Sequence, residues 1–186
     1  MVGRIGVVPL GACGFANTLL SVPLVFGFGL LSAVSVRASH SHGGGRAKEA
    51  GENVRGGFVV ALLLSIPVLI SLYGILPHIA IFGQPGEVNA AVGGYLIICA
   101  WSLVPVFFTC VSKNFCEALG HPWPPFWIML AGVLLNAFLN WILIFGNWGA
   151  PAMGLEGAAV ATLLARIAVM AGVFAYPALS RSLRAA

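Results

Sequence analysis

Five long apolar stretches, separated by short polar segments, dominate the pattern of the chain. A membrane-spanning helix needs roughly 20 mostly apolar residues, because the hydrocarbon core is about 30 Å thick and each helical residue rises about 1.5 Å. All five stretches reach that length, and the first is too long for the apolar region of a cleavable signal peptide. The predicted spans cover approximately residues 5–36, 58–82, 88–112, 123–145 and 155–178. The pattern predicts an all-α, polytopic membrane helix bundle, and we expect residues 1–186 to form a single bundle.

The composition agrees with a membrane protein. Hydrophobic residues make up 60% of the chain and charged residues only 8%, whereas soluble domains carry about a quarter charged residues. The lipid bilayer is therefore an expected partner. The net charge of +4 is small and scattered, so it does not indicate a nucleic-acid partner.

The distribution of Lys and Arg between the polar segments predicts the topology. These residues gather in a predicted loop at 38–56 and in the tail, at Arg181 and Arg184, while the loops at 84–87 and 147–151 have none. By the positive-inside rule, the loop at 38–56 and the tail are cytoplasmic, and the other two loops are external. Five spans then place the start of the chain outside, so we expect a further helix before it and interpret the chain as a fragment.

Motifs for catalysis or for a bound metal are not evident. The sequence contains no HExxH, no GxSxG and no Asp. His40 and His42 form the one histidine cluster, and a metal there would need at least one more ligand. The glycine run Gly43–Arg46 lacks the ending of a phosphate-binding loop. We expect no enzymatic activity, no cofactor and no catalytic or metal site. The four cysteines form no CxxC pair, and we expect them to be reduced.

Polar residues inside the last two spans carry the candidate site. Asn136 and Asn140 are four residues apart, as are Thr162 and Arg166, so each pair shares one helix face. An Arg near mid-membrane costs several kcal/mol if it faces lipid, so we expect Arg166 to face the bundle interior or an aqueous path. Asn and Thr also serve as interhelical hydrogen-bond partners, worth about 0.6–2 kcal/mol each. For Asn136, Asn140 and Thr162, two roles stay open, packing between helices and lining of a cavity. We expect these three side chains to meet in one polar pocket.

Several short motifs occur in the order and spacing of a known family. They are Pro23 with Gly29–Ala33, Ala38-Ser39 before Gly43–Arg46, Asn114–Gly120, Leu135–Asn140 running into Ile144–Gly146, and Gly154–Thr162. Each motif is short, but together they extend over nearly the whole chain. On these residues, the chain resembles the multidrug and toxic compound extrusion (MATE) family of cation-coupled antiporters.

The resemblance implies a larger protein than this chain. Members of the family have two six-helix lobes with a substrate cleft between them. The chain would supply the second to sixth helices of the amino-terminal lobe, with a first helix and a second lobe as its missing partners. The whole transporter would exchange Na⁺ or H⁺, as coupling ion, for a small organic and typically cationic substrate. Its expected location is the cell membrane, as a multi-pass protein of the bacterial inner membrane.

The resemblance also assigns candidate residues to a cation site. In this lobe, the family uses an Asp on the first helix, an Asn and an Asp four residues apart on the fifth, and a Thr on the sixth. Asn136 matches the Asn and Thr162 the Thr, while Asn140 occupies the second acidic position without a carboxylate. Together with Arg166, these residues form the expected cation and substrate cavity.

The residues alone leave two alternative functions open. A flippase of related fold that moves a lipid-linked saccharide would need several cationic residues along its cleft, and Arg166 is one such residue. A small membrane scaffold subunit would need no transport site at all. Neighbouring genomic sequence that encodes an upstream helix with an Asp and a downstream second lobe would favour the exporter.

Overall fold

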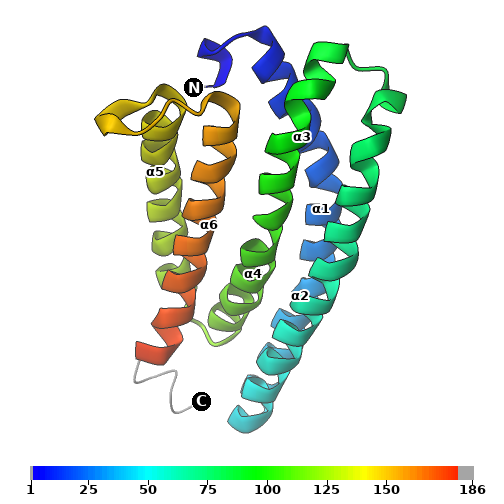
Figure 1. Cartoon of the computed structure of the whole chain (residues 1–186). Coiled ribbons are helices and arrows are strands. Elements are labelled where there is room, and N and C mark those ends of the chain that lie inside the picture. The colour runs from blue at the N-terminus through cyan, green and yellow to red at the C-terminus, as the bar shows by residue number, and fades with distance from the viewer. Residues whose placement is uncertain (1, 180–186) are drawn as a thin grey trace.

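The computed structural model describes the backbone of residues 2–179 and, within it, all side chains except those of residues 47, 48, 50, 178 and 179. The α-helices of this part are α1 (Val7–Gly43), α2 (Ala47–Ile75), α3 (Gly86–Trp101), α4 (Leu103–Ala118), α5 (Trp123–Phe145) and α6 (Gly154–Leu179). Short 3-10 helices, η1 (Val2–Arg4), η2 (Leu76–Phe82) and η3 (Asn147–Gly149), lie at or between their ends. The helices run along one another as a bundle (Figure 1). The predicted cytoplasmic tail at Arg181 and Arg184 lies outside the described residues.

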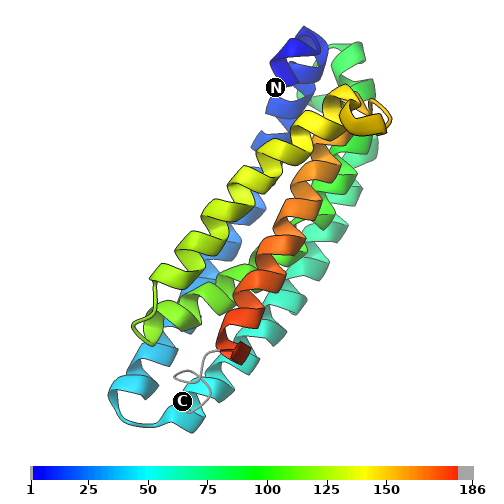
Figure 2. The ribbon, with the colours of Figure 1, turned by 90° about the vertical axis from the view of Figure 1, so that its left-hand side faces the viewer.

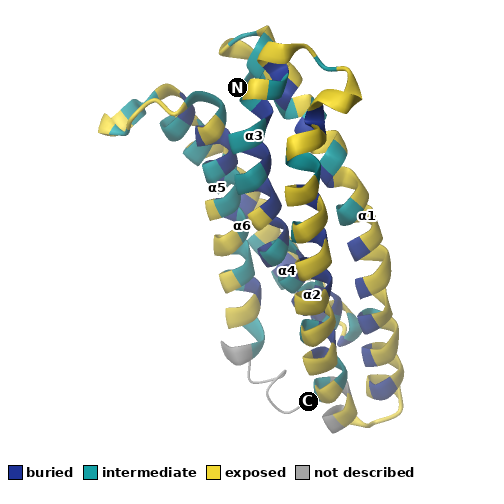
Figure 3. Cartoon of the chain, turned by 45° about the vertical axis from the view of Figure 1, so that its right-hand side comes forward, coloured by how far each residue is buried: buried dark blue, intermediate teal, exposed yellow. Residues whose placement is uncertain are grey.

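Five helical stretches of the described chain are long and apolar enough to cross a membrane, with mean hydropathy between 2.0 and 2.5. They are Val7–Gly43, Gly51–Phe82, Gly86–Ala118, Trp123–Phe145 and Gly154–Pro177. The predicted all-α membrane bundle is therefore confirmed. Exposed residues cover the outward faces of α1 and α2, with buried residues between the helices (Figure 3). Many exposed side chains are large and apolar, for example Val22, Val25 and Ile70, as expected of a surface that faces lipid.

The predicted loop at 38–56 is wrong. Helix α1 continues to Gly43 and α2 begins at Ala47, so the connection is only the turn Gly44–Arg46. Gly45 has a φ of 70°, a left-handed conformation that glycine adopts without steric cost. Arg46 and Glu49 form an ion pair of 3.0 Å across the first turn of α2. Polar residues in this region thus mark where the two helices leave the apolar zone, not where they end.

The third span, predicted as one segment at 88–112, is longer and is interrupted. Helix α3 ends at Trp101, α4 begins at Leu103, and Ser102 lies between them. Pro105 explains the break, because proline has no N–H to donate to the carbonyl of Trp101 and its ring clashes with that carbonyl. At the break, the Ser102 hydroxyl donates to the Cys99 carbonyl at 2.6 Å.

The helices form two unequal groups. α1 packs against α2, α3 and α4, and their shared core contains fully buried Leu31, Phe107 and Val111. α6 packs against α3 and α4, whereas α5 packs mainly against α6. In Figure 1, α5 and α6 accordingly lie together at the left, beside the remaining helices. Gly132 faces Val169, and a Cβ at Gly132 would collide with that side chain, so α5 and α6 approach closely through a small residue.

The connections lie at two opposite ends of the bundle. The turn Gly44–Arg46 and the connection between α4 and α5 lie at one end, and the segments after η2 and η3 lie at the other (Figure 2). Residues Gln84 and Asn147 therefore lie at the end of the bundle opposite to Arg46. This arrangement agrees with the prediction from the loop charges, which places them on the other side of the membrane from Arg46. That the Arg46 end is cytoplasmic remains a prediction.

Candidate functional site

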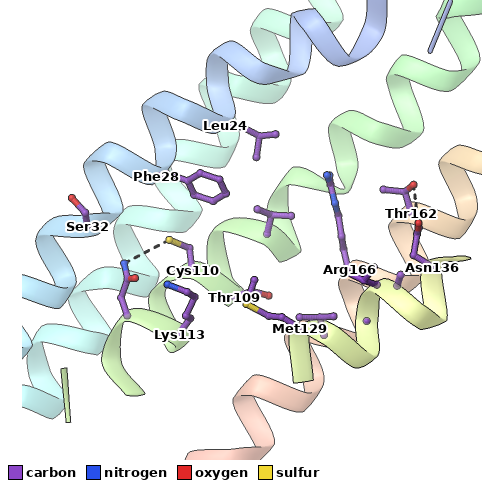
Figure 4. Close-up of a pocket in the computed structure, with 16 residues that line it drawn as sticks. Leu24, Phe28, Ser32, Thr109, Cys110, Lys113, Met129, Asn136, Thr162 and Arg166 are labelled. Carbon is purple, nitrogen blue, oxygen red and sulfur yellow. Dashed lines mark hydrogen bonds between the residues drawn. The ribbon is translucent and has the colours of Figure 1, made fainter. Parts of the chain in front are cut away.

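A cavity of about 730 Å³ lies between α1, α4, α5 and α6. α5 packs mainly against α6, and the cavity lies beside this pair, between α5 and α1. Its walls are mostly apolar, with Leu24 and Phe28 of α1 opposite Met129 of α5. Figure 4 shows side chains from all four helices around this space. Ligand sites for small organic molecules commonly have this volume and this mostly apolar lining.

The candidate residues of the last two helices form a chain of hydrogen bonds. Asn140 Nδ2 donates to Asn136 Oδ1 at 3.0 Å, and Asn136 Nδ2 donates to Thr162 Oγ1 at 3.4 Å. Thr162 Oγ1 in turn donates to the Ala158 carbonyl at 2.8 Å. We call Asn136, Asn140 and Thr162 the polar trio. The trio joins α5 to α6, so it has the contacts that an interhelical packing role requires.

The trio also borders the cavity. Asn136 and Thr162 line it, whereas Asn140 is not among the lining residues. Asn140 precedes the end of α5 at Phe145 by five residues, and Thr162 follows Gly154 by eight. At the helical rise, they lie about 8 and about 12 Å from those helix ends, at similar depth. The structure therefore brings the three predicted residues together near the end of the bundle that carries Asn147; their role in binding a cation stays a prediction.

Arg166 points into the bundle from α6, one helical turn beyond Thr162. Its Nη1 donates to the Ser102 hydroxyl at 2.5 Å, at the break between α3 and α4. Ser102 is fully buried. Arg166 also lines the cavity, where its long side chain extends beside Asn136 and Thr162 (Figure 4). An Arg side chain that faces lipid costs several kcal/mol. The interior position of Arg166 avoids that cost.

Two further polar residues of α4 line the cavity near the opposite end. Lys113 Nζ lies 2.8 Å from Glu117 Oε1, the pairing that their four-residue spacing suggests. Asn114 is buried, and its Nδ2 donates to the Leu31 carbonyl of α1 at 3.0 Å. Asn114 therefore fixes α4 against α1 beside the cavity.

Ser102, the partner of Arg166, and Asn114 in the lining are not among the predicted site residues, and neither are the lining residues Ser32, Thr109 and Lys113. Ser102 and Asn114 are polar positions within or at the edge of a predicted apolar span, so the criterion that selected Asn136 and Arg166 applies to them as well. Ser102 also precedes Pro105 by three residues, a spacing that indicates a helix break. Their partners, Arg166 and the Leu31 carbonyl, come from distant parts of the chain and are visible only in the fold.

Comparison with protein families and curated sequences identifies relatives among transporters. The MatE family matches residues 1–142. A probable multidrug resistance protein NorM of Bradyrhizobium diazoefficiens is 36% identical over 180 residues, which is 96% of this chain and 38% of that protein. The multidrug resistance protein NorM of Aliivibrio fischeri is 30% identical over 164 residues, or 88% of this chain and 36% of its own length. The chain thus spans less than two fifths of the length of these relatives.

Solved structures show the same fold. A crystal structure of MATE in the bent conformation superimposes with a TM-score of 0.87 at 21% identity, covering 97% of this chain and 40% of that one. An outward-facing conformation of a multidrug resistance MATE family transporter gives a TM-score of 0.83 at 22% identity, covering 97% and 39%. With its five membrane-length helical stretches and the match of the family over residues 1–142, the chain belongs to the MATE family of membrane transporters.

Proposed function

We propose that these residues form part of the amino-terminal lobe of a multidrug exporter that couples the entry of a cation to the export of organic compounds. The observation that carries the proposal is the cavity itself, which combines apolar walls with the polar trio on α5 and α6. Apolar walls would hold the organic part of a substrate, and the trio would hold the coupling ion. Such a protein binds and moves its substrate without chemical change, in the bacterial inner membrane.

The coupling ion at the trio would be Na⁺. Asn136 and Asn140 offer amide oxygens and Thr162 a hydroxyl oxygen, and none of these side chains takes up a proton at neutral pH. Oxygen donors of this kind suit hard cations. Neutral oxygens alone hold a cation weakly, so a carboxylate from the remainder of the protein, the Asp that the resemblance places on a first helix, would complete the site.

Coupling would follow from differential binding. A cation shifts an equilibrium between two conformations only if it binds one of them more tightly. In transporters with repeated lobes, the lobes rock around a shared site near the middle of the membrane. The cavity reaches from Thr162 to Lys113 along the bundle, so it would form one wall of such a shared cleft.

The alternatives have less support. The relatives carry names of multidrug resistance proteins, which favours export of drug-like compounds over movement of a lipid-linked saccharide. A scaffold subunit would not need a cavity that is lined by an Arg and by hydrogen-bonded Asn and Thr side chains.

A chimera tests the proposal directly. The 180 matched residues would replace the corresponding residues of the Bradyrhizobium relative, and the chimera would be expressed in an efflux-deficient bacterial strain. We expect resistance to organic dyes and antibiotics that depends on a Na⁺ gradient. Replacing Asn136 and Thr162 by Ala in the chimera should remove the Na⁺ dependence. A chimera that inserts into the membrane at normal levels but exports nothing would contradict the proposal.

A second experiment expresses the 186-residue chain by itself in the same efflux-deficient strain. We expect no resistance from it, because alternating access needs one lobe to move against another. Robust, cation-dependent resistance from these residues alone would instead indicate a small transporter that works as a homo-oligomer.

A further inference from the structure

A second, smaller pocket lies where α4 and α5 meet, at the end of the bundle that carries Arg46. Its volume is about 320 Å³. Two charged residues of α4 line it, Lys113 and Glu117, and the rest of the lining is apolar and consists of Pro122, Phe126, Met129, Leu130 and Val133. The pocket therefore presents a positive charge, a negative charge and an apolar wall to the same occupant.

The charged part and the apolar part of the pocket lie at different depths along the helices. Lys113 and Glu117 precede the end of α4 at Ala118 by five residues and one residue, so both lie within about 8 Å of that end. The lining residues of α5 are spaced three and four apart, which places them on one helix face. This face extends to Val133, ten residues or about 15 Å from the start of α5 at Trp123. The charges are therefore outermost, and the apolar wall extends from them towards the middle of the bundle.

The charged part of the pocket lies at the level of the lipid headgroups. With its 23 residues, α5 is about 35 Å long, slightly more than the hydrocarbon core of about 30 Å that it crosses. Trp123 and Trp127 in its first turns are exposed, at 68% and 59%, as is typical of Trp at the boundary between membrane and water. The apolar wall of the pocket therefore lies at the depth of acyl chains.

The ion pair keeps hydrogen-bonding capacity for a further partner. Lys113 Nζ lies 2.8 Å from Glu117 Oε1 and donates to Oε2 at 2.9 Å, and each side chain is about a third exposed. An ammonium group has three N–H donors, and a carboxylate can accept about four hydrogen bonds. Glu117 would repel a purely anionic headgroup, and Lys113 would repel a purely cationic one. A headgroup that carries both a phosphate and an ammonium group would instead satisfy both residues.

We propose that this pocket binds a phospholipid with a phosphoethanolamine headgroup. The phosphate pairs with Lys113, the ammonium group pairs with Glu117, and an acyl chain lies along the apolar face of α5. A primary ammonium group donates hydrogen bonds to a carboxylate, whereas the quaternary ammonium of choline has no N–H to donate. The pocket therefore prefers phosphatidylethanolamine to phosphatidylcholine. The inference goes beyond the proposed function, because the occupant is a lipid of the surrounding membrane and not an exported compound.

Retention of lipid by the purified 186-residue chain tests the inference. The chain is stripped of lipid in detergent and incubated with an equimolar mixture of dioleoyl phosphatidylethanolamine, phosphatidylcholine and phosphatidylglycerol. After gel filtration, mass spectrometry quantifies the lipid that stays bound. We expect phosphatidylethanolamine to be retained about threefold more than either other lipid, an effect of the size that a partly exposed charge pairing provides. Equal retention of phosphatidylethanolamine and phosphatidylcholine, or preferred retention of phosphatidylglycerol, would overturn the inference.

Substitutions assign the preference to the ion pair of the pocket. Glu117→Gln removes the partner of the ammonium group and should abolish the preference over phosphatidylglycerol, and Lys113→Gln should lower the retention of phosphatidylethanolamine. The matched control combines Arg46→Gln with Glu49→Gln, which removes an ion pair of 3.0 Å that lies outside the pocket, and it should leave the preference intact. An unchanged preference in Glu117→Gln, or the same loss in the control, would overturn the assignment.

Two further readouts keep the result interpretable. Circular dichroism reports whether each variant is folded, and if the α4 variants are not, the comparison of the three lipids on the unchanged chain still decides. Export by the chimera is scored separately. An inactive chimera beside an intact preference for phosphatidylethanolamine would contradict only the exporter proposal, and an active chimera beside equal lipid retention would contradict only the lipid site.

Discussion

Arg166 and Ser102 connect α6 to the point where α3 gives way to α4, through a hydrogen bond of 2.5 Å from Nη1 to Oγ. Ser102 is also the donor that satisfies the Cys99 carbonyl in the interrupted third span. One buried hydroxyl thus accepts from a cation on a distant helix and donates to the backbone of its own. The break that Pro105 produces is therefore also the place where the lining arginine is held.

Ser102→Ala should destabilise the bundle by about 1–2 kcal/mol, because it leaves a buried guanidinium N–H without its partner. The measurement is reversible unfolding in mixed micelles, followed by circular dichroism. Ser32→Ala is a matched control, because Ser32 donates to the Gly29 carbonyl at 2.7 Å much as Ser102 donates to Cys99, but it is exposed. Equal stability of the two variants would show that the bond to Arg166 contributes nothing measurable.

Arg166→Gln should raise the affinity of the polar trio for Na⁺ about tenfold or more. Arg166 follows Thr162 by one helical turn and lines the same cavity, so its charge would repel a cation at the trio, for example across a separation of about 8 Å. At an effective dielectric constant of about 20, that repulsion amounts to about 2 kcal/mol. Binding of ²²Na⁺ to the purified chain measures the effect, with Arg37→Gln as the control for loss of charge. Unchanged Na⁺ affinity in Arg166→Gln would place the cation elsewhere.

Asn140→Asp should also increase Na⁺ binding, by at least tenfold, because it adds a carboxylate next to Asn136 and Thr162. Asn136 can turn its amide so that the N–H groups face the new carboxylate and its oxygen faces the cation. The control is Asn147→Asp, which adds the same charge in η3 at the end of the bundle. If both variants bind Na⁺ equally, the trio is packing and not an ion site.

Gly132→Ala should destabilise the contact between α5 and α6 by about 1–3 kcal/mol, because the added methyl group collides with Val169. Gly14→Ala is the matched control, since a Cβ there meets nothing within 4 Å. Unfolding midpoints of the two variants provide the comparison. Adding Val169→Ala to Gly132→Ala should recover most of the loss, and failure to recover would mean that the two residues do not collide.

Cysteine labelling in intact cells tests the predicted topology of the bundle. In a background without the four native cysteines, Asn147→Cys should react with a membrane-impermeant maleimide, and Arg46→Cys should react only after permeabilisation. The expectation follows from the Lys and Arg of the Arg46 end. The reverse pattern would invert the bundle in the membrane.

The sequence predicted the membrane bundle because apolar length is a local property that each span carries by itself. Asn136 and Asn140 were recognised as neighbours for the same reason, since four-residue spacing places them on one helix face. The turn Gly44–Arg46 was missed because polarity and helicity are separate signals, and α1 and α2 stay helical beyond the apolar zone. The pairing of Arg166 with Ser102 was missed because the two lie 64 residues apart, and only the packing of α6 against α3 and α4 brings them together.

Because α5 packs mainly against α6, the width of the cavity depends on the orientation of one antiparallel helix pair. The close approach at Gly132 and the bond from Asn136 to Thr162 would make α5 and α6 move as a rigid body, with α6 sliding on α3 and α4. In such a shear motion, the distance between Asn136 and Thr162 would stay constant while that between Arg166 and Phe28 of α1 changed. Spin labels at the two residues of each pair would measure both distances, and would therefore show which helices move together and which stay in place.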